Sequence, residues 1–162
     1  MTLGIANIHS GTDVSNVIPE TAKFRVSLRF FNMGEGAKAV DIVKEIPEAT
    51  ARMHHCTVEF SDLMKILSEP VINDSHYSEL AAAALNDILP EGTVSSCPKR
   101  YASESYSMYL ERYPGVFAFL GIRNEELGTG AEHHNEKFDV DDSVQKLGVL
   151  STAKYAVSLL AE

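Results

Sequence analysis

The stretch AKFRVSLRFF at residues 22–31 decides the fold class. Its apolar and polar side chains alternate, so that one face carries Phe24, Val26, Leu28 and Phe30 and the other carries Lys23, Arg25, Ser27 and Arg29. A period of two residues is typical of a half-buried β-strand. Residues 3–8 also have the pattern of a strand, and the polar turn at residues 10–13 predicts that the two strands are antiparallel neighbours.

The residues that follow predict a helix over 36–55, interrupted by Pro47, and a third strand over 57–64. Residues 1–67 therefore have the order β-β-α-β. A common two-layer unit has the order β-α-β-β-α-β. The chain lacks the first strand and helix of that unit, so the sequence is expected to begin inside a domain.

A linker over residues 68–74 leads into a second piece. Its pattern predicts a helix to about Leu89 capped by Asn73 or Asp74, a strand over 93–97, and a helix over 104–113 capped by Ser103. The apolar run at 116–121 is typical of a strand covered on both faces, and a last helix is expected over 142–160. Residues 68–162 thus read α-β-α-β-α, and the fold class is α/β: an α+β piece followed by an α/β layer piece.

The composition excludes several classes of protein. The net charge is −9, and the 14 Lys and Arg residues form no run, which argues against a nucleic-acid or anionic membrane surface. No apolar run approaches the roughly 18 residues of a membrane span, and no signal-peptide pattern begins the chain, so a cytoplasmic location is expected. Cys56 and Cys97 form no Cys-x-x-Cys motif and are predicted to be buried free thiols.

The stretch GAEHHNEKFDVDD at residues 130–142 places two adjacent histidines in a polar loop. A neutral imidazole on a loop is a common metal ligand, but zinc needs at least three protein ligands. The partners of such a histidine must lie elsewhere in this chain or outside it. A self-contained site built from the histidines at 9, 54, 55, 133 and 134 has no supporting ligand spacing.

Several segments resemble one family in the right order along the chain. HSGTDVSNVIP at 9–19 is similar to that family's Gly-Gly-Thr…Asn-Val-Ile-Pro segment, and Arg29 to the arginine of its Val-Arg-Thr-Phe. ASESY at 102–106 resembles its Gly-Ser-Glu-Asp-Phe, PGVFAFLG at 114–121 its final strand, and HNEKFD at 134–139 its His-Ser-Pro-x-Phe-Asp loop. The chain is identified as a member of the M20 metallopeptidases, in the amidohydrolase branch.

The resemblance implies a longer enzyme, of which this is the C-terminal portion. Residues 1–67 would be part of a ferredoxin-like dimerisation or lid domain, and residues 68–162 the C-terminal part of a zinc-peptidase-like catalytic domain. The family's early metal ligands, its catalytic Glu-Glu pair and its lid histidine have no counterpart here. Glu125-Glu126 is not that pair, because it lies in the loop after the last predicted strand. No catalytic residue is therefore expected within the chain.

The resemblance also implies roles for individual residues. His134 aligns with the family's last metal ligand, whereas His133 is expected to be an ordinary surface residue. Asn16 and Arg29 would touch the carboxylate end of the substrate across a dimer; the alternatives are a turn residue and an exposed strand charge. Ser103 and Glu104 would open a helix whose N–H groups face a carboxylate, the alternative being a plain helix cap. Ser105 departs from the family's Asp.

The predicted function follows from the resemblance. The complete enzyme would use a divalent metal (zinc, or manganese or cobalt) to activate water, and would hydrolyse the amide bond of N-acyl amino acids or small peptides as a homodimer. The chain alone is expected to hold no catalytic metal and to be inactive. The alternative is a non-catalytic truncated dimerisation or structural module. An unpaired sheet edge predicts self-association in either case.

Overall fold

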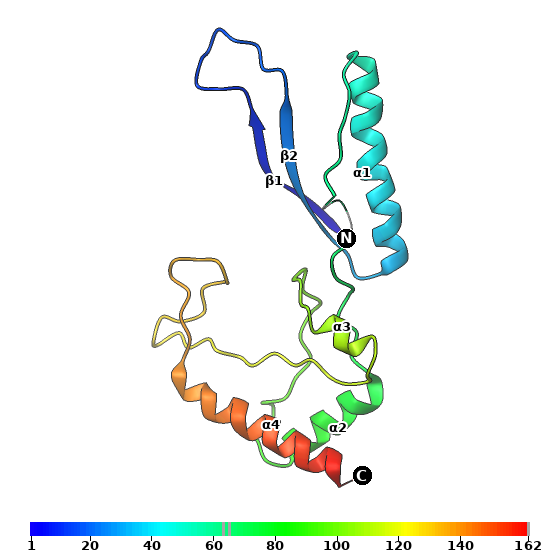
Figure 1. Cartoon of the computed structure of the whole chain (residues 1–162). Helices are drawn as coiled ribbons and strands as arrows, with labels where there is room; N and C mark the ends of the chain where they lie inside the picture. Colours follow the sequence, from blue (N-terminus) through cyan, green and yellow to red (C-terminus); the bar gives the residue numbers. More distant parts are fainter. Residues whose placement is uncertain (63, 65, 162) are drawn as a thin grey trace. The chain divides into compact units, whose positions relative to one another are not determined.

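The computed structural model describes residues 1–62, 64 and 66–161. These residues form mixed α and β structure, with a two-stranded antiparallel sheet, four α-helices and one 3-10 helix (Figure 1). They belong to two compact units. The hairpin unit comprises Met1–Ile72 and Pro98–Tyr109, and the helix-pair unit comprises Asn73–Cys97 and the chain from Leu110 onward.

The hairpin unit is built on the two strands that the sequence predicts. β1 (Thr2–Ser10) and β2 (Ala22–Arg29) are antiparallel, and Leu3 lies opposite Leu28, Ile5 opposite Val26, and Ile8 opposite Phe24. The register shifts between Ile5 and Asn7, which is how a bulge keeps Ile5 and Ile8 on the same face. The alternation of β2 thus produces one apolar face, which we call the apolar hairpin face: Leu3, Ile5, Ile8, Phe24, Val26 and Leu28.

The prediction that this face is half-buried is wrong for most of its members. Ile8 is 61% exposed, Phe24 60% and Ile5 57%. The alternation places side chains on a face but does not supply the layer that covers it. A two-stranded hairpin gains little stability until its apolar face is covered.

The helix expected over 36–55 is α1 (Met33–Met53), and it begins at a polar cap. Oδ1 of Asn32 accepts the Glu35 N–H at 3.1 Å. Gly36 is buried against the Phe30 ring, where an added Cβ would lie 2.7 Å from the ring carbons, so only glycine permits this approach. Pro47 lies inside the helix without ending it.

α1 ends in a complete Schellman motif. The Cys56 N–H donates to the Ala51 carbonyl at 2.9 Å, and the His55 N–H donates to the Arg52 carbonyl at 3.3 Å. In this motif the residue directly after the C-cap has a left-handed backbone. His54 is the C-cap, and His55 accordingly has φ 56°. A histidine therefore occupies the position at which helices usually have glycine.

The helix-pair unit consists of α2 (Ser75–Asn86) packed against α4 (Gln145–Leu160). Oδ1 of Asp74 caps α2 by accepting the Tyr77 N–H at 3.1 Å. A short 3-10 helix, η1 (Asp142–Val144), leads into α4. Together the two elements cover the range 142–160 over which the sequence predicts a helix. The two long helices are also joined by an ion pair in which Lys154 Nζ lies 2.6 Å from Asp87 Oδ2.

The strands predicted over 57–64, 93–97 and 116–121 do not form in the described residues; Leu63 lies outside them. A strand needs a neighbouring strand to satisfy its backbone. At 116–121 a side chain replaces that neighbour: Asn73 Nδ2 donates to the Phe117 carbonyl at 2.9 Å, and the Phe117 N–H donates to Asn73 Oδ1 at 2.8 Å. The predicted α/β layer is therefore not formed by these residues.

Two further expectations are corrected. The helix predicted over 104–113 is only α3 (Ser107–Leu110). Cys56 and Cys97 are free thiols, as predicted, but both are exposed. Within the hairpin unit, the segment from Pro98 contacts the first part of the chain. The Tyr101 and Phe31 ring centroids lie 4.4 Å apart, and the Tyr101 hydroxyl accepts a hydrogen bond from the Met1 amino group at 2.8 Å.

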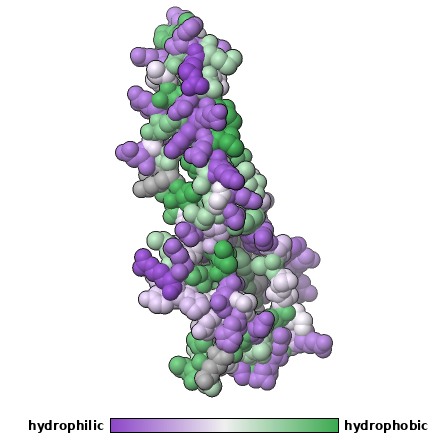
Figure 2. Space-filling model, turned by 90° about the vertical axis from the view of Figure 1, so that its right-hand side faces the viewer, coloured by the Kyte–Doolittle hydropathy of each residue, from purple (hydrophilic) through white to green (hydrophobic). Residues whose placement is uncertain are grey.

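Apolar side chains are abundant on the surface. Figure 2 shows them as several green areas among the polar residues of one face. Of the described residues, only Ala39 and Ala84 are buried apolar side chains. None of the helices in the described part of the chain combines the length and apolar character needed to cross a bilayer.

Candidate functional site

The candidate site is built around the segment from Asn124 to Asp141, here called the His134 loop. Hydrogen bonds join its two ends, since Asn124 Nδ2 donates to Asp141 Oδ2 at 2.7 Å and the Asp141 N–H donates to the Ile122 carbonyl at 3.1 Å. The partners are 17 residues apart in sequence. The loop therefore starts and ends at one place, directly before η1.

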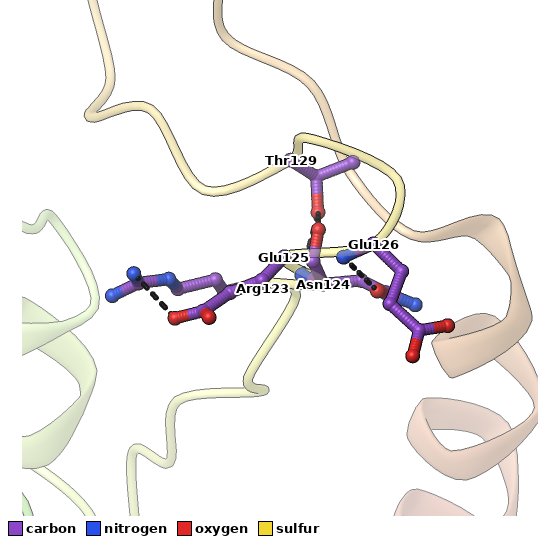
Figure 3. Close-up of polar contacts among 5 residues, drawn as sticks. All are labelled: Arg123, Asn124, Glu125, Glu126 and Thr129. Atoms are coloured by element: carbon purple, nitrogen blue, oxygen red, sulfur yellow. Dashed lines mark hydrogen bonds and ion pairs between the residues drawn. The ribbon is translucent and has the colours of Figure 1, made fainter.

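The first turn of this loop is held by Thr129, which is only 7% exposed. The Asn124 N–H donates to Thr129 Oγ1 at 2.7 Å, and the Thr129 hydroxyl donates to the Ile122 carbonyl at 3.1 Å. Figure 3 shows the Thr129 hydroxyl donating to the Asn124 carbonyl, at 3.4 Å, and the hydrogen bond from the Glu126 N–H to Asn124 Oδ1, which measures 3.0 Å. Glu125 and Glu126 thus lie in a turn, as the sequence predicts, with Glu125 paired to Arg123 at 2.8 Å.

Gly130 ends this turn in a conformation that other residues do not adopt. Its φ is 113°, and an added Cβ would lie 2.5 Å from Arg123 Cγ. Both the backbone conformation and the close contact require glycine.

His133 and His134 lie at the far part of the loop and are both exposed. The His133 ring packs edge-on against Phe138, with 4.9 Å between ring centroids. Beyond them, Asn135 turns the chain: its carbonyl accepts the Phe138 N–H at 3.0 Å, and its Oδ1 accepts the Lys137 N–H at 2.9 Å. His133 therefore packs against Phe138, whereas the imidazole of His134 makes no comparable ring contact with the described residues.

The backbone of His134 is left-handed, with φ 63°. Histidine adopts this region more often than most residues, but it remains uncommon outside glycine. Together with the exposed imidazole, this backbone presents a side chain that packing does not explain. The chemistry available to it is donation of a nitrogen lone pair to a metal or of an N–H to an acceptor.

The residues present do not make a metal site by themselves. Within residues 1–62, 64 and 66–161, no three His, Cys, Asp or Glu side chains gather closely enough to hold an ion. His134 would be one donor of a set, and zinc needs at least three.

Asn16 and Arg29 lie at opposite ends of the hairpin. Asn16 is an exposed residue of the connection between β1 and β2, whereas Arg29 pairs with Thr2 at the other end. The ladder from Ala22 to Arg29 spans roughly 23 Å at about 3.3 Å per residue. One small ligand therefore cannot touch both side chains of the same hairpin. Arg29 lies on the polar face, where its Nε donates to Ser27 Oγ at 3.2 Å.

Ser103 does not cap a helix. Its hydroxyl pairs instead with the Ser68 hydroxyl at 3.1 Å. The following turn is capped by Glu104, whose Oε1 accepts the Tyr106 N–H at 3.1 Å. This is the plain capping role that was the alternative for the segment, but with Glu104 in the place of Ser103.

Hydrogen bonds at the end of the loop change the pKa of the Asp141 carboxyl group. Hydrogen bonds from the Asn124 amide and then from Ser143 lower the pKa of Asp141 from its ordinary value. The Ser143 N–H donates to Asp141 Oδ1 at 2.9 Å and thereby caps η1. The same carboxylate therefore closes the His134 loop and starts the C-terminal helix.

The predicted site residues are divided between the two units. His134 belongs to the helix-pair unit, and the hairpin unit contains Asn16, Arg29, Ser103 and Glu104. The sequence did not single out Asn124, Thr129 or Asp141. The available signals were Gly128 and Gly130, which mark a tight turn, and the Asp before the last helix.

Comparison with known proteins places the chain among hydrolases. It is 31% identical to Thermostable carboxypeptidase 1 of Saccharolobus solfataricus over 96% of this chain and 38% of that protein. It is 30% identical to Thermostable carboxypeptidase 2 of the same organism, over the same shares of the two chains. It is 24% identical to IAA-amino acid hydrolase ILR1-like 4 of Arabidopsis thaliana over 94% of this chain and 35% of that protein.

These relatives are M20-family carboxypeptidases and IAA-amino acid hydrolases, and the chain is their homologue. The family predicted from the sequence is thereby confirmed. The chain spans rather more than a third of the length of the curated relatives it matches. No family model and no solved structure matches it.

Proposed function

We propose that this chain is the C-terminal portion of a metal-dependent amidohydrolase that hydrolyses N-acyl amino acids or small peptides. The observation that carries the proposal is the match of nearly the whole chain to carboxypeptidases and to IAA-amino acid hydrolases. Both names describe hydrolases whose substrates contain an amino acid joined through an amide. That shared chemistry is the substrate class we assign.

In this proposal the two pieces of the chain have different tasks. Residues 1–67 are part of a ferredoxin-like lid that pairs two subunits, and residues 68–162 complete a catalytic domain. Arg29 and Asn16 recognise the carboxylate end of the substrate. Because they lie at opposite ends of the hairpin, Arg29 and Asn16 of one chain would serve different sites of a homodimer. Ser103 and Glu104 keep their proposed place beside the substrate.

His134 is proposed as one ligand of a divalent metal, zinc or else manganese or cobalt. Its exposed imidazole and left-handed backbone support this role. The metal would supply an activated water in the complete enzyme, but the remaining ligands must come from outside the described residues. The two free thiols are in keeping with a reducing, cytoplasmic location.

The proposal is tested by replacing the matching segment of Thermostable carboxypeptidase 1 with this chain. The chimera is expected to bind zinc and to cleave an N-acyl amino acid. The change His134→Ala should reduce kcat/KM by at least about 100-fold and reduce the bound zinc, because changes one shell further out already cost 10–100-fold. His133→Ala is the matched control and should retain zinc and most activity.

Two outcomes would contradict the proposal. A folded, active chimera that loses neither zinc nor activity with His134→Ala would remove His134 from the metal site. A chimera that unfolds cooperatively yet is inactive would favour the second candidate, a non-catalytic dimerisation module. That candidate is favoured by one observation, the exposure of the apolar hairpin face.

A further inference from the structure

The His134 loop is closed by one side-chain pair. Asn124 Nδ2 donates to Asp141 Oδ2 at 2.7 Å, and both residues are only partly exposed. A hydrogen bond to an ionised carboxylate is stronger than a neutral one. The pair joins positions 17 residues apart. Opening it would leave the two ends of the loop joined by the hydrogen bond from the Asp141 N–H to the Ile122 carbonyl, at 3.1 Å, without the side-chain bond that reinforces it.

Every other polar group of the pair is held by the backbone. Asn124 Oδ1 accepts the Glu126 N–H at 3.0 Å, and Asp141 Oδ1 accepts the Ser143 N–H at 2.9 Å. Each side chain is therefore fixed from one end by its own turn and reaches its partner with the other end. This arrangement ties the loop to the turn at its start and to the helix at its end.

We propose that Asn124 and Asp141 are positioning residues, whose hydrogen bond fixes the place at which the loop presents the His134 imidazole. The chemical purpose rests on the proposed function, because a metal ligand gains affinity when its position is set before the ion binds. The positioning itself is a property of this chain. Fixing the loop ends lowers the conformational freedom that binding would otherwise remove.

The change Asn124→Asp tests the pair selectively. It keeps the acceptor for the Glu126 N–H but replaces the Nδ2 donor by a carboxylate oxygen that faces Asp141. The double change Asn124→Asp with Asp141→Asn exchanges the partners, so the amide of residue 141 can donate to the carboxylate of residue 124. Asn135→Asp is the matched control, since Asn135 Oδ1 accepts the Lys137 N–H and the change keeps that acceptor.

The first readout is the backbone order parameter of His134 by ¹⁵N relaxation of the full chain at pH 7. The unaltered chain should give a value near 0.8 although His134 is exposed, since rigid backbone gives about 0.85 and flexible backbone less than about 0.6. Asn124→Asp should lower it below about 0.6, the exchanged pair should restore it, and Asn135→Asp should leave it unchanged. The values of α4 should stay constant throughout.

A loss of order in the chain that the exchanged pair does not restore would overturn the proposal, as would an unchanged order parameter in Asn124→Asp. A flexible His134 in the unaltered chain would overturn it without any variant, which covers the case in which Asn124→Asp fails to fold.

The second readout is the affinity for Zn²⁺ of the chimera described above. Asn124→Asp should weaken it by 10–100-fold and the exchanged pair should restore it. Order parameters that respond while Zn²⁺ affinity does not would leave the pair as a loop closure only and overturn its positioning role. A chimera whose Zn²⁺ binding is insensitive to His134→Ala overturns the proposed function instead, so the two failures are distinguishable.

Discussion

Single polar side chains form hydrogen bonds with backbone groups at several places where no neighbouring strand pairs with them. Asn73 satisfies both backbone groups of Phe117, at 2.9 and 2.8 Å. Asn32 and Asp74 each satisfy a free N–H at the start of a helix. Asp141 satisfies the Ser143 N–H and the Asn124 amide together. Because buried or half-buried backbone groups must be paired, these residues fix local structure where no sheet partner is present.

The Asp141 contacts predict a pH dependence of stability. Since the folded chain holds the pKa of Asp141 below its ordinary value of 3.8, the folded state prefers the ionised form. The resulting stabilisation is fully present above about pH 3.8 and is lost as the pH falls through the lower pKa of the folded state. Unfolding by urea should therefore show an advantage of the unaltered chain over Asp141→Asn that is constant near neutral pH and shrinks below pH 3.8. An advantage that grows on acidification would contradict the assignment.

At the scale of elements, the sequence predicts helices better than strands. α1, α2 and α4 form because their signals are local: a cap residue, an apolar stripe and good helix formers. The strands at 57–64, 93–97 and 116–121 fail because their alternation or apolar run requires partners that these residues do not supply. β1 and β2 succeed because each supplies the backbone partner that the other needs, even though residues 11–21 separate them.

The candidate site was predictable only where a motif marks it. The polar loop with its two histidines marks this segment, but only the family resemblance points to His134, whose role as a metal ligand stays a prediction. The residues that close the loop were not identified, because a hydrogen bond between Asn124 and Asp141 has no signature at a separation of 17 residues. Ser103 was predicted to cap a helix, but the turn that follows it is held by the Glu104 carboxylate, which accepts the Tyr106 N–H.

The end of α1 gives a prediction at this scale. His55 has φ 56° at the position where a Schellman motif favours glycine, and a left-handed L-residue costs about 1–2 kcal/mol. His55→Gly should therefore raise the free energy of unfolding by about 1 kcal/mol, measured by urea unfolding followed by circular dichroism. His54→Gly is the control, because His54 has φ −107° and gains nothing from glycine. Equal effects of the two changes would show that the strain at His55 is not released.

At the scale of the whole molecule, large apolar side chains are exposed in each of the two units. Ile5, Ile8 and Phe24 belong to the hairpin unit, and Val149 and Val157 to the helix-pair unit. Apolar surface of this extent marks a region that another chain segment or subunit covers.

The isolated chain is therefore expected to self-associate through the apolar hairpin face. Ile5→Lys places a charge on that face and should shift sedimentation velocity profiles toward monomer. Asn7→Lys adds the same charge on the opposite face, across the register shift, and should leave the profiles unchanged. Association that responds equally to both changes would indicate pairing through the open strand edge rather than through the face. An unaltered chain that stays a monodisperse monomer at high concentration in light scattering would show that neither surface attracts a second copy, and would leave the exposed face to be covered by another segment of the complete enzyme.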